Sequence, residues 1–469
     1  MTPGIPPTLE SPHFVGIGGA GMSGIAKILA QRGAAVAGSD ARESGTVAAL
    51  RELGAVVHLG HAAGHLDPGA TAVVVSSAIR EDNPELAAAR ARGLPVVHRS
   101  DALAAVMDGL RPIAVAGTHG KTTTTSMLAV ALRTLGRDPS YAIGGDIDAP
   151  GSNAHHGAGD LFVAEADESD RSFHKYAPEV AIVLNVELDH HANYASLEEI
   201  YASFETFAAR IVPGGTLVVS ADHPGARELT RRLAAGGVRT VTYGESPDAD
   251  ARVLSVTPHG LASEVTVVLD GAKHTFGVSV PGRHYAHNAV AALAAGAAAG
   301  VPAAELAPAL ASFTGVGRRL QPKGTAGGVR VVDTYAHHPT EMSADLEAVR
   351  AAADDGHGGR TGRILVVFQP HLFSRTRELG TEMGQALALA DASVVLGIYP
   401  AREDPIPGVT SDIIIDAARA RGADVTPAPD MAAVPGLVAG MAKPGDLVLT
   451  MGAGDVTELG PRILSRLEG

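Results

Sequence analysis

The sequence of 469 residues contains no cysteine and no tryptophan. The absence of cysteine excludes a disulfide scaffold, a cysteine-ligated metal site and thiol catalysis. Aromatic residues make up only 4% of the chain, so the hydrophobic cores have to be built mainly from Ala, Val, Leu and Ile. Lysine is also scarce, and a lysine in a special loop therefore stands out. The lysines are Lys27, Lys121, Lys175, Lys273, Lys323 and Lys443.

Positive charge and long apolar runs are in short supply as well. The formal net charge of −14 argues against nucleic-acid binding or a polybasic membrane anchor, although local basic pockets for phosphates remain possible. Residues 1–12 show no basic region followed by an apolar run, which a secretory signal would need. The uncharged stretch 286–304 contains His287, Asn288 and Pro302, and we expect a packed helix there, without membrane insertion. A cytoplasmic location is the expectation.

Short apolar strands alternate with helical patterns along the whole chain, in three runs. This alternation predicts an α/β fold with mainly parallel sheets covered on both faces. A polar segment at 108–112 is expected to be a linker between the first two runs. The predicted strands lie at 13–17, 35–39, 73–76, 96–98, 113–116, 161–164, 180–185, 217–220, 239–243, 264–269, 329–333, 364–368, 392–398 and 447–451. Helices are predicted at 21–32, 84–92 and 288–300, and after the glycine-rich turn at 117–120.

The first glycine-rich loop, Gly16-Ile17-Gly18-Gly19-Ala20-Gly21, follows a predicted strand and opens a helix. Glycine allows a tight turn and a close approach of a pyrophosphate, which then lies at the helix N-terminus. Asp40 stands at the end of the next strand, where a ribose-binding acid belongs. The loop indicates a nucleoside diphosphate without naming its base. The alternative is a tight turn that binds nothing.

The second glycine-rich loop, Gly117-Thr118-His119-Gly120-Lys121-Thr122-Thr123, also lies between a strand and a helix. Backbone N–H groups in such a loop hold phosphate oxygens, Lys121 reaches the outer phosphates and Thr122 can bind Mg²⁺. Val115 stands where the strict P-loop pattern has its first glycine, and a chance match is the alternative. Together the two loops suggest one nucleotide as energy source and another as a handle on the substrate.

Acidic residues and histidines follow the strands next to the second loop. The run Glu165–Asp170 holds four acids in six residues, and Asn185–His190 ends the neighbouring strand. Hard oxygen ligands at the carboxyl end of a strand suit Mg²⁺, particularly beside a phosphate loop. A solvated acidic turn and a histidine that only caps a turn are the alternatives.

These motifs resemble the Mur ligase family. The resemblance extends over the whole chain, and its order of motifs is specific. The motifs that carry it are GIGGAGMSG at 16–24, GTHGKTT at 117–123, EADESD at 165–170, residues 185–190, 282–289, 317–319 and 332–341, FQPHLFSRTR at 368–377, PIPGV at 405–409 and GDLVLTMGAGD at 445–455.

The resemblance implies three domains, at 1–110, 111–316 and 317–469: a Rossmann-like domain for the UDP-sugar, a P-loop-type domain for ATP and Mg²⁺, and a Rossmann-like domain for the amino acid. It also implies an ATP-dependent ligation in peptidoglycan precursor synthesis, and it favours the member that joins L-alanine to UDP-N-acetylmuramate through an acyl phosphate. The protein is then expected to be a monomer or a weak homodimer.

By resemblance, roles fall on individual residues. The catalytic candidates are Lys121, His190, Arg319, His337, His371 and Arg375. The ATP-binding candidates are Gly117, Thr118, His119, Gly120, Lys121, Thr122, Thr123, Asn288 and Arg319, and the metal candidates are Thr122, Glu165 and His190. The substrate candidates are Gly18, Gly19, Ala20, Gly21, Met22, Ser23, Asp40, Ser76, Tyr335, His337, His371 and Arg375.

Two positions depart from the family pattern. Tyr285 replaces an asparagine near the adenine, so that only Asn288 carries over, and Thr334 occupies a position that is often acidic. Three other functions remain open at this point. A nicotinamide dehydrogenase would use the first loop alone, a nucleotide sensor would lack catalysis, and a sister ligase would attach a preformed peptide to the same sugar nucleotide.

Overall fold

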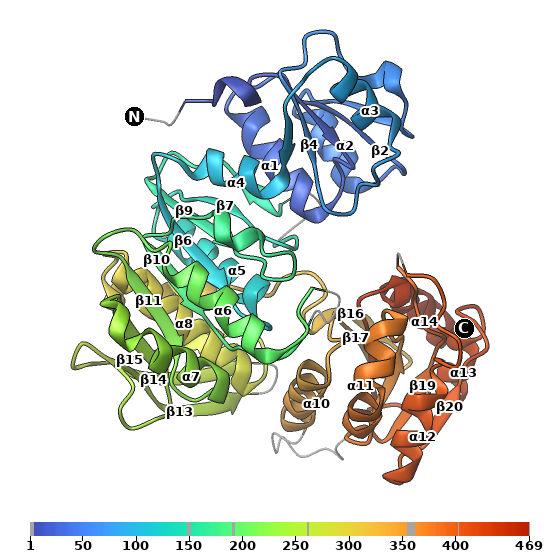
Figure 1. Ribbon diagram of the computed structural model, residues 1–469. Coiled ribbons are helices and arrows are strands. Elements are labelled where there is room, and N and C mark those ends of the chain that lie inside the picture. The colour runs from blue at the N-terminus through green and yellow to red at the C-terminus, as the bar shows by residue number, and fades with distance from the viewer. Residues whose placement is uncertain are drawn as a thin grey trace. The chain divides into compact units, whose positions relative to one another are not determined.

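The computed structural model describes residues 4–147, 152–189, 193–259, 262–353, 362–401 and 403–468. Within these residues it contains three β-sheets, of five, ten and six strands, each flanked by helices (Figure 1). The predicted α/β class, with three mainly parallel sheets, is confirmed. The chain divides into two compact units, one formed by residues 1–254, 266–276 and 287–313, and the other by residues 255–265, 277–286 and 314–469.

The five-stranded sheet lies at the start of the chain and is parallel throughout. Its elements are β1 (Pro12–Val15), α1 (Ala20–Gln31), β2 (Ala37–Asp40), α2 (Gly45–Glu52), β3 (Val56–Leu59), β4 (Ala72–Val75), α3 (Pro84–Ala91), β5 (Val96–His98) and α4 (Arg99–Met107). The strand order β3-β2-β1-β4-β5 places β1 at the centre. The hydroxyl of Ser44 and the side-chain oxygen of Asn83 accept backbone N–H groups at the starts of α2 and α3, which defines where these helices begin.

The ten-stranded sheet has a parallel part that runs from β13 to β7. Its elements are β6 (Arg111–Ala116), α5 (Lys121–Thr134), β7 (Ser140–Ala142), β8 (Ala154–His155), β9 (Leu161–Glu165), the 3₁₀ helix η3 (Ser172–Lys175), β10 (Val180–Val183), α6 (Leu197–Ala208), β11 (Thr216–Ser220), α7 (Pro224–Leu233), β12 (Arg239–Gly244), β13 (Ala251–His259), β14 (Ala262–Leu269), β15 (Ala272–Val278), α8 (Arg283–Ala298) and α9 (Ala303–Ala309). The strand order is β15-β14-β13-β12-β11-β10-β6-β9-β7-β8, and β8 pairs antiparallel with β7.

The linker expected at 108–112 is wrong in its second half, because β6 already begins at Arg111. The polar appearance of this segment has a structural cause. The guanidinium of Arg111 pairs with Glu179 at 2.7 Å and with Asp160 at 3.1 Å, so that a charged residue starts a buried strand. Only residues 108–110 separate α4 from β6.

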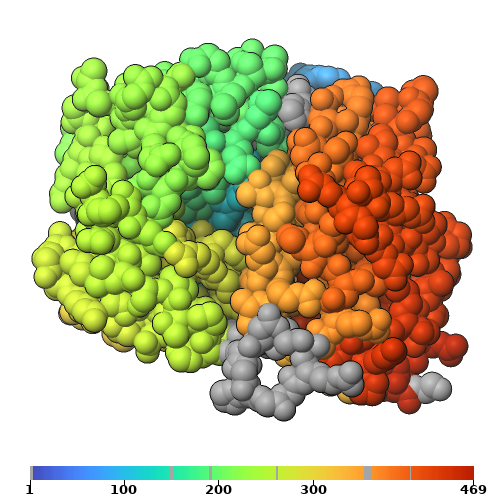
Figure 2. Space-filling view, turned by 90° about the horizontal axis from the view of Figure 1, so that it is seen from below, coloured from blue at the N-terminus to red at the C-terminus, as the bar shows by residue number. Residues whose placement is uncertain are grey.

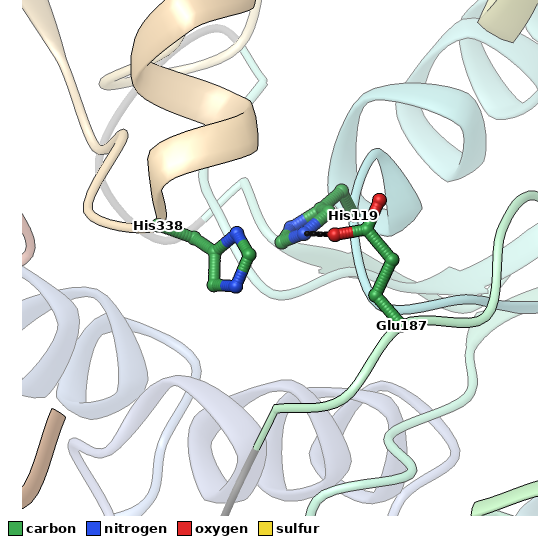
Figure 3. A group of neighbouring side chains, drawn as sticks. All are labelled: His119, Glu187 and His338. Carbon is green, nitrogen blue, oxygen red and sulfur yellow. Dashed lines mark ion pairs between the residues drawn. The ribbon is translucent and has the colours of Figure 1, made fainter. Parts of the chain in front are cut away.

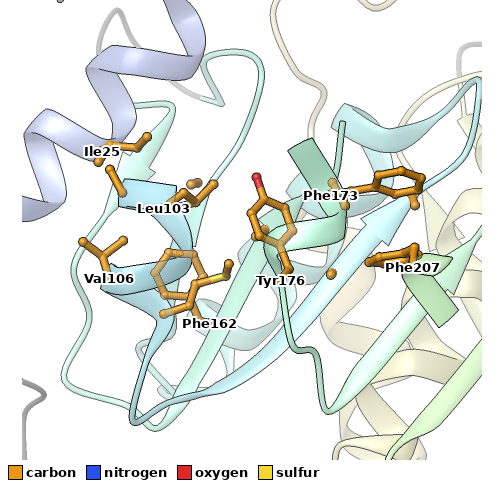
Figure 4. Close-up of a cluster of buried hydrophobic side chains, with 14 of the residues drawn as sticks. Ile25, Leu103, Val106, Phe162, Phe173, Tyr176 and Phe207 are labelled. Carbon is orange, nitrogen blue, oxygen red and sulfur yellow. The ribbon is translucent and has the colours of Figure 1, made fainter. Parts of the chain in front are cut away.

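A single hydrophobic core joins the first two sheets. Ile25 of α1 and Val106 of α4 belong to the same buried cluster as Phe162 of β9, Phe173 of η3 and Phe207 of α6 (Figure 4). Because this apolar surface is continuous from one sheet to the other, both sheets fall within one compact unit. The side chain of Asn153 adds a polar link by donating to the carbonyl of Ala20 and to Ser23 in α1.

The six-stranded sheet forms the centre of the second unit. Its elements are β16 (Gln321–Ala326), β17 (Val329–Thr334), α10 (Pro339–Ala353), β18 (Ile364–Phe368), α11 (Phe373–Leu387), β19 (Ala392–Val395), α12 (Asp412–Ala420), β20 (Val425–Pro427), α13 (Val434–Met441), β21 (Leu447–Met451) and α14 (Leu459–Glu468). The strand order is β16-β17-β21-β18-β19-β20, and only the edge strand β16 is antiparallel to its neighbour. In Figure 2 the orange and red atoms of this region pack closely.

The strand predicted at 392–398 is shorter in the structure and ends at Val395. The apolar stretch at 286–304 falls mainly in α8, as predicted, and α8 begins at Arg283, five residues before the predicted helix start at 288. Among the described residues, no helix is both long enough and apolar enough to cross a membrane.

Candidate functional site

The first glycine-rich loop connects β1 to α1 in a tight turn. Gly16 adopts a φ of +75°, which favours glycine, and the N–H groups of Gly16 and Ile17 both donate to the carbonyl of Ser39. The carboxylate of Asp40 accepts the N–H of Gly18 at 2.8 Å. A methyl group on Gly18 would lie only 2.9 Å from Val47 and 3.0 Å from Asp40. The N–H groups of Gly16, Ile17 and Gly18 are thus used within the protein to hold the turn, and Asp40 braces it at the start of α1.

The other predicted residues near this loop occupy two environments. Gly19, Ala20 and Gly21 are exposed at the start of α1, whereas Met22 and Ser23 are buried in its first turn. Ser76 follows β4, which lies next to the central strand β1, and is half-buried. The neighbouring Ser77, which the sequence did not single out, donates its hydroxyl to Asp170 at 3.1 Å.

The second glycine-rich loop connects β6 to α5. Gly117 and Gly120 have φ values of +135° and +85°, and Gly120 directly precedes α5. The ammonium of Lys121 donates to the carbonyl of Gly117 at 2.7 Å and to Glu168 at 2.9 Å. Burial by itself lowers the pKa of Lys121, but the attraction of Glu168 and neighbouring acids outweighs this effect and raises it. Lys121 is therefore a charged group held inside the loop.

The predicted metal ligands of this region meet at the carboxyl end of the sheet. The Thr122 hydroxyl donates to Glu165 Oε2 at 3.0 Å, and the Gly144 N–H donates to the same oxygen at 2.8 Å. A hydroxyl and a carboxylate beside a phosphate loop form the hard oxygen donor set that Mg²⁺ prefers, so these two side chains fit the ion. His190, the third predicted ligand, lies outside the described residues.

Residues from neighbouring elements hold the second loop in place. The side chain of Asn185 accepts the N–H of His119 at 2.8 Å and donates to its carbonyl at 3.1 Å. The imidazole of His119 points toward the carboxylate of Glu187 (Figure 3), with 3.4 Å between Nε2 and Oε2. Asn288, on α8, lies so close to Gly120 that a methyl group there would be 2.8 Å from its Oδ1. The loop is therefore held by the segment that follows β10 and by α8.

The remaining residues of the second loop are largely buried. Thr118 accepts the N–H of Glu187 through its hydroxyl at 2.9 Å, which fixes the middle of the loop. Thr123 is buried in the first turn of α5.

In the second unit, four predicted residues lie next to one another. The guanidinium of Arg319 lies 5.3 Å from the ring centre of Tyr335, whose ring makes an edge contact with His337 at 5.2 Å. His337 in turn lies 6.0 Å from the ring of His371. Glu341 anchors this group, because its carboxylate accepts the N–H of His337 and lies 3.6 Å from Arg319.

The adjacent Arg318 has a different role from Arg319. Its guanidinium donates to the carbonyls of Gly452 and Gly454 and lies 3.6 Å from the buried Asp333. Arg318 therefore ties the segment after β21 to β17, whereas Arg319 belongs to the cluster with Tyr335.

Thr334, the unusual residue of this region, is fully buried at the end of β17. Its hydroxyl donates to Asp345 of α10 at 2.5 Å, which links the helix to the strand. Tyr285 is likewise buried, with 3% of its surface exposed, and burial raises the pKa of its phenol well above the usual value.

Arg375 is buried in α11, whereas Arg377 is exposed and pairs with Glu378. His371 stacks on Tyr399 with 5.6 Å between ring centres. Leu372, which directly precedes α11, has a φ of +75°. This strained conformation turns the chain from the segment after β18 into α11.

The comparisons with known proteins agree with this arrangement. The chain matches the family models described as "Mur ligase family, catalytic domain" at residues 11–111, "Mur ligase middle domain" at 115–296 and "Mur ligase, glutamate ligase domain" at 318–454. The chain belongs to the Mur ligase family. Among Mur ligases, the UDP-N-acetylmuramate--L-alanine ligase of Streptomyces coelicolor is 79% identical over 467 residues, which cover 100% of both chains.

More distant Mur ligases share the fold. The crystal structure of a UDP-N-acetylmuramate-alanine ligase from Thermotoga maritima is 29% identical, with a TM-score of 0.81 and coverage of 97% of this chain and 98% of the other. A murein peptide ligase from Psychrobacter arcticus is 25% identical, with a TM-score of 0.70 and coverage of 98% and 99%. The order of the three family regions matches the order of the three sheets along the chain.

Proposed function

We propose that this Mur ligase joins L-alanine to UDP-N-acetylmuramate with ATP as the energy source, as a step of peptidoglycan precursor synthesis. The observation that carries the proposal is the end-to-end 79% identity to the alanine ligase of S. coelicolor. The two glycine-rich loops support it, because they differ in charge and serve different nucleotides in this reaction. The more distant similarity to a murein peptide ligase gives weaker support to the alternative, a peptide-adding enzyme.

The proposed division of labour follows the sheets. Residues 1–110 bind the UDP-sugar at Gly18–Ser23, with Asp40 and Ser76 nearby. Residues 111–316 bind ATP at Gly117–Thr123, with Asn288 beside the loop. Residues 317–469 bind the amino acid and the reacting carboxylate.

The reaction begins with the attack of the lactyl carboxylate on the γ-phosphate of ATP, which forms an acyl phosphate and releases ADP. The amine of L-alanine then attacks the acyl carbon, and phosphate leaves as the amide bond forms. An anion that attacks a polyphosphate needs positive charge around the transferred group. Lys121 supplies that charge once it exchanges Glu168 for a phosphate oxygen. Thr122 and Glu165 would hold Mg²⁺, which would neutralise further charge on the phosphates.

The cluster of the second unit supplies the remaining groups. Arg319 is proposed to contact the phosphates of ATP, and His337, His371 and Arg375 are proposed to contact the reacting groups. Tyr335 is proposed to contact the substrate. In the described structure Glu341 pairs with Arg319 and His337, which restricts the orientation of both side chains.

An ADP-release assay with UDP-N-acetylmuramate and a series of amino acids tests the function. ADP release that requires the sugar nucleotide and is fastest with L-alanine supports the proposal. Release that requires a preformed peptide in place of L-alanine would identify a sister ligase. ATP hydrolysis that is independent of the sugar nucleotide would refute the proposal.

A cytoplasmic location and a monomeric or weakly dimeric state are also part of the proposal. Light scattering over a range of protein concentrations tests the oligomeric state. A stable mass of two or more chains at the lowest concentration would contradict it.

A further inference from the structure

Arg99 lies between the two glycine-rich loops, at the point where the first two sheets meet. It is the first residue of α4, and its Nη2 donates to Asp167 at 2.9 Å and to Asp170 at 3.0 Å. Both carboxylates belong to the acidic segment 165–170 that follows β9. Although only 19% of its side chain is exposed, Arg99 remains charged, because Asp167 and Asp170 outweigh the effect of burial and raise its pKa.

The other side of the guanidinium faces the first loop. A methyl group on Gly21 would lie 2.7 Å from Nη1 of Arg99, so this nitrogen is in contact with the first turn of α1. The first loop itself has no lysine or arginine between Gly16 and Gly24. A nucleoside diphosphate at the start of α1 therefore has Arg99 as a cation close by.

The acidic segment also leads to the second loop. Its first residue, Glu165, accepts the Thr122 hydroxyl, and Glu168 pairs with Lys121. Between them in the sequence, Asp167 accepts a hydrogen bond from Nη2 of Arg99 at 2.9 Å. The acidic segment thus pairs with Arg99 through Asp167 and Asp170 and with Lys121 through Glu168, and so connects the two cations.

We infer that Arg99 is a positioning residue that couples nucleotide binding at the two loops. A diphosphate at the first loop fixes the guanidinium, and the guanidinium fixes the acidic segment on which Lys121, Thr122 and the metal depend. Each nucleotide then binds a site that the other has already ordered, so each tightens the binding of the other by the same factor. The inference rests on the proposed function, because it needs two separate nucleotide sites.

The neighbouring ion pair of Lys175 and Asp101 provides a matched control. It also connects η3 to α4, with 3.1 Å between Nζ and Oδ1, but both side chains are largely exposed. If Arg99 only holds the two sheets together, loss of either ion pair should have a similar effect on nucleotide binding. If Arg99 couples the loops, Lys175→Gln should leave the coupling unchanged.

Calorimetric titration of the full chain with UDP, with and without a saturating non-hydrolysable ATP analogue and Mg²⁺, tests the inference. In the unmodified protein the analogue should lower the Kd of UDP at least about fivefold. In Arg99→Gln this factor should fall to about one, while the Kd of the analogue measured alone changes by less than about twofold. Asp170→Asn should reduce the factor in part, because one of the two carboxylates remains.

Thermal unfolding shows whether each variant is folded. If Arg99→Gln does not fold, Arg99→Lys is used in its place. An ammonium group lacks the planar guanidinium that contacts both the acidic segment and Gly21, so the coupling should again be lost. The inference would be overturned if the coupling persisted in the Arg99 variant or if Lys175→Gln abolished it equally. It would also be overturned if the ATP analogue raised the Kd of UDP in the unmodified protein. If UDP and the analogue compete for one site, the proposed function itself fails.

Discussion

The two glycine-rich loops have the same backbone plan but differ in the charged side chains around them. Both follow a central parallel strand and open a helix, β1 to α1 and β6 to α5. The second loop contains its own cation, Lys121, and lies beside Glu165 and Glu168. The first loop is neutral, and the cation that contacts it at Gly21, Arg99, comes from a helix that starts 78 residues after Gly21 (99 − 21).

In the proposed function, this difference lets one local fold serve two chemical tasks. A loop that only holds a substrate needs backbone N–H groups and little else. A loop at which phosphate is transferred needs positive charge and oxygen ligands at the place where charge develops. The strand–turn–helix frame is common to both, and the surrounding side chains determine which task each loop performs.

The largest expected effect is on the rate of ligation, and it should leave UDP binding at the first loop unchanged. Lys121→Ala should lower the rate of ligation by at least about 10²–10³-fold, because the transferred phosphoryl group loses a preorganised cation. The Kd of UDP, measured by calorimetry, should remain within about twofold of its original value, since Lys121 is not part of the first loop. If UDP binding were lost together with activity, the two loops would not have separate tasks.

The second test addresses the metal. Glu165→Gln should raise the Mg²⁺ concentration needed for half-maximal activity by about 10–100-fold, because one anionic ligand is removed. Glu179→Gln is the matched control: Glu179 lies just before β10, which β6 separates from β9, at the opposite edge of the sheet, and pairs with Arg111. An unchanged Mg²⁺ requirement in Glu165→Gln would exclude this residue as a ligand.

A smaller effect is expected in the first loop. Gly18→Ala should weaken UDP binding by about tenfold, because the new methyl group displaces Asp40 or Val47 and distorts the turn. Binding of the ATP analogue alone should not change. Gly64→Ala is the control, since a methyl group there meets no atom within 4 Å. Equal losses at both nucleotide sites would show that the loops are not independent in structure.

The last test concerns the support beneath the first loop, and its effect is on the stability of the fold. Glu85 is fully buried, and it accepts hydrogen bonds from Ser39 at 2.6 Å and from the N–H of Ala62 at 3.1 Å, and contacts His13 at 3.2 Å. Burial alone would raise the pKa of Glu85, but these partners lower it from 4.5 to about 2. A carboxyl group with a lowered pKa stabilises the fold fully above its unfolded value and loses this contribution as the pH falls through its folded value.

Glu85→Gln should therefore destabilise the protein near neutral pH by about 3 kcal/mol, because the buried histidine and hydroxyl lose a charged acceptor. The difference in unfolding temperature between the two proteins should shrink as the pH falls from about 4.5 toward 2. Thermal unfolding followed by circular dichroism measures this difference. A difference that stays constant over this range would show that the ionised carboxylate is not the source of the stability.

The sequence predicted those parts of the site that lie within one loop or at the ends of adjacent parallel strands. Thr122 and Glu165 are 43 residues apart, yet they were expected to meet because a phosphate loop and an acidic segment follow strands of one sheet. The cluster of Arg319, Tyr335 and His337 was found through resemblance, and the structure places these residues together. Their assigned roles stay predictions.

The residues that the sequence missed are partners from distant elements. In the sequence, nothing distinguishes Arg99 from other arginines in the first turn of a helix. Its contacts with Asp167 and Asp170 depend on how the two sheets pack. Glu85 lies 72 residues from His13, and no spacing rule relates them. The antiparallel strands β8 and β16 were missed because they are edge strands, and β8 is only two residues long.

The sequence by itself determined the α/β class, the two phosphate loops and the acids beside the second one, because each depends on local periodicity or on short motifs with fixed backbone requirements. The tertiary structure decided which charges neutralise one another. Lys121 pairs with Glu168, Arg318 is bound to backbone carbonyls while Arg319 lies against Tyr335, and Arg99 bridges the acidic segment and Gly21. Such pairings follow from the packing of sheets and helices, since electrostatic attraction depends on distance in space and is independent of separation along the chain.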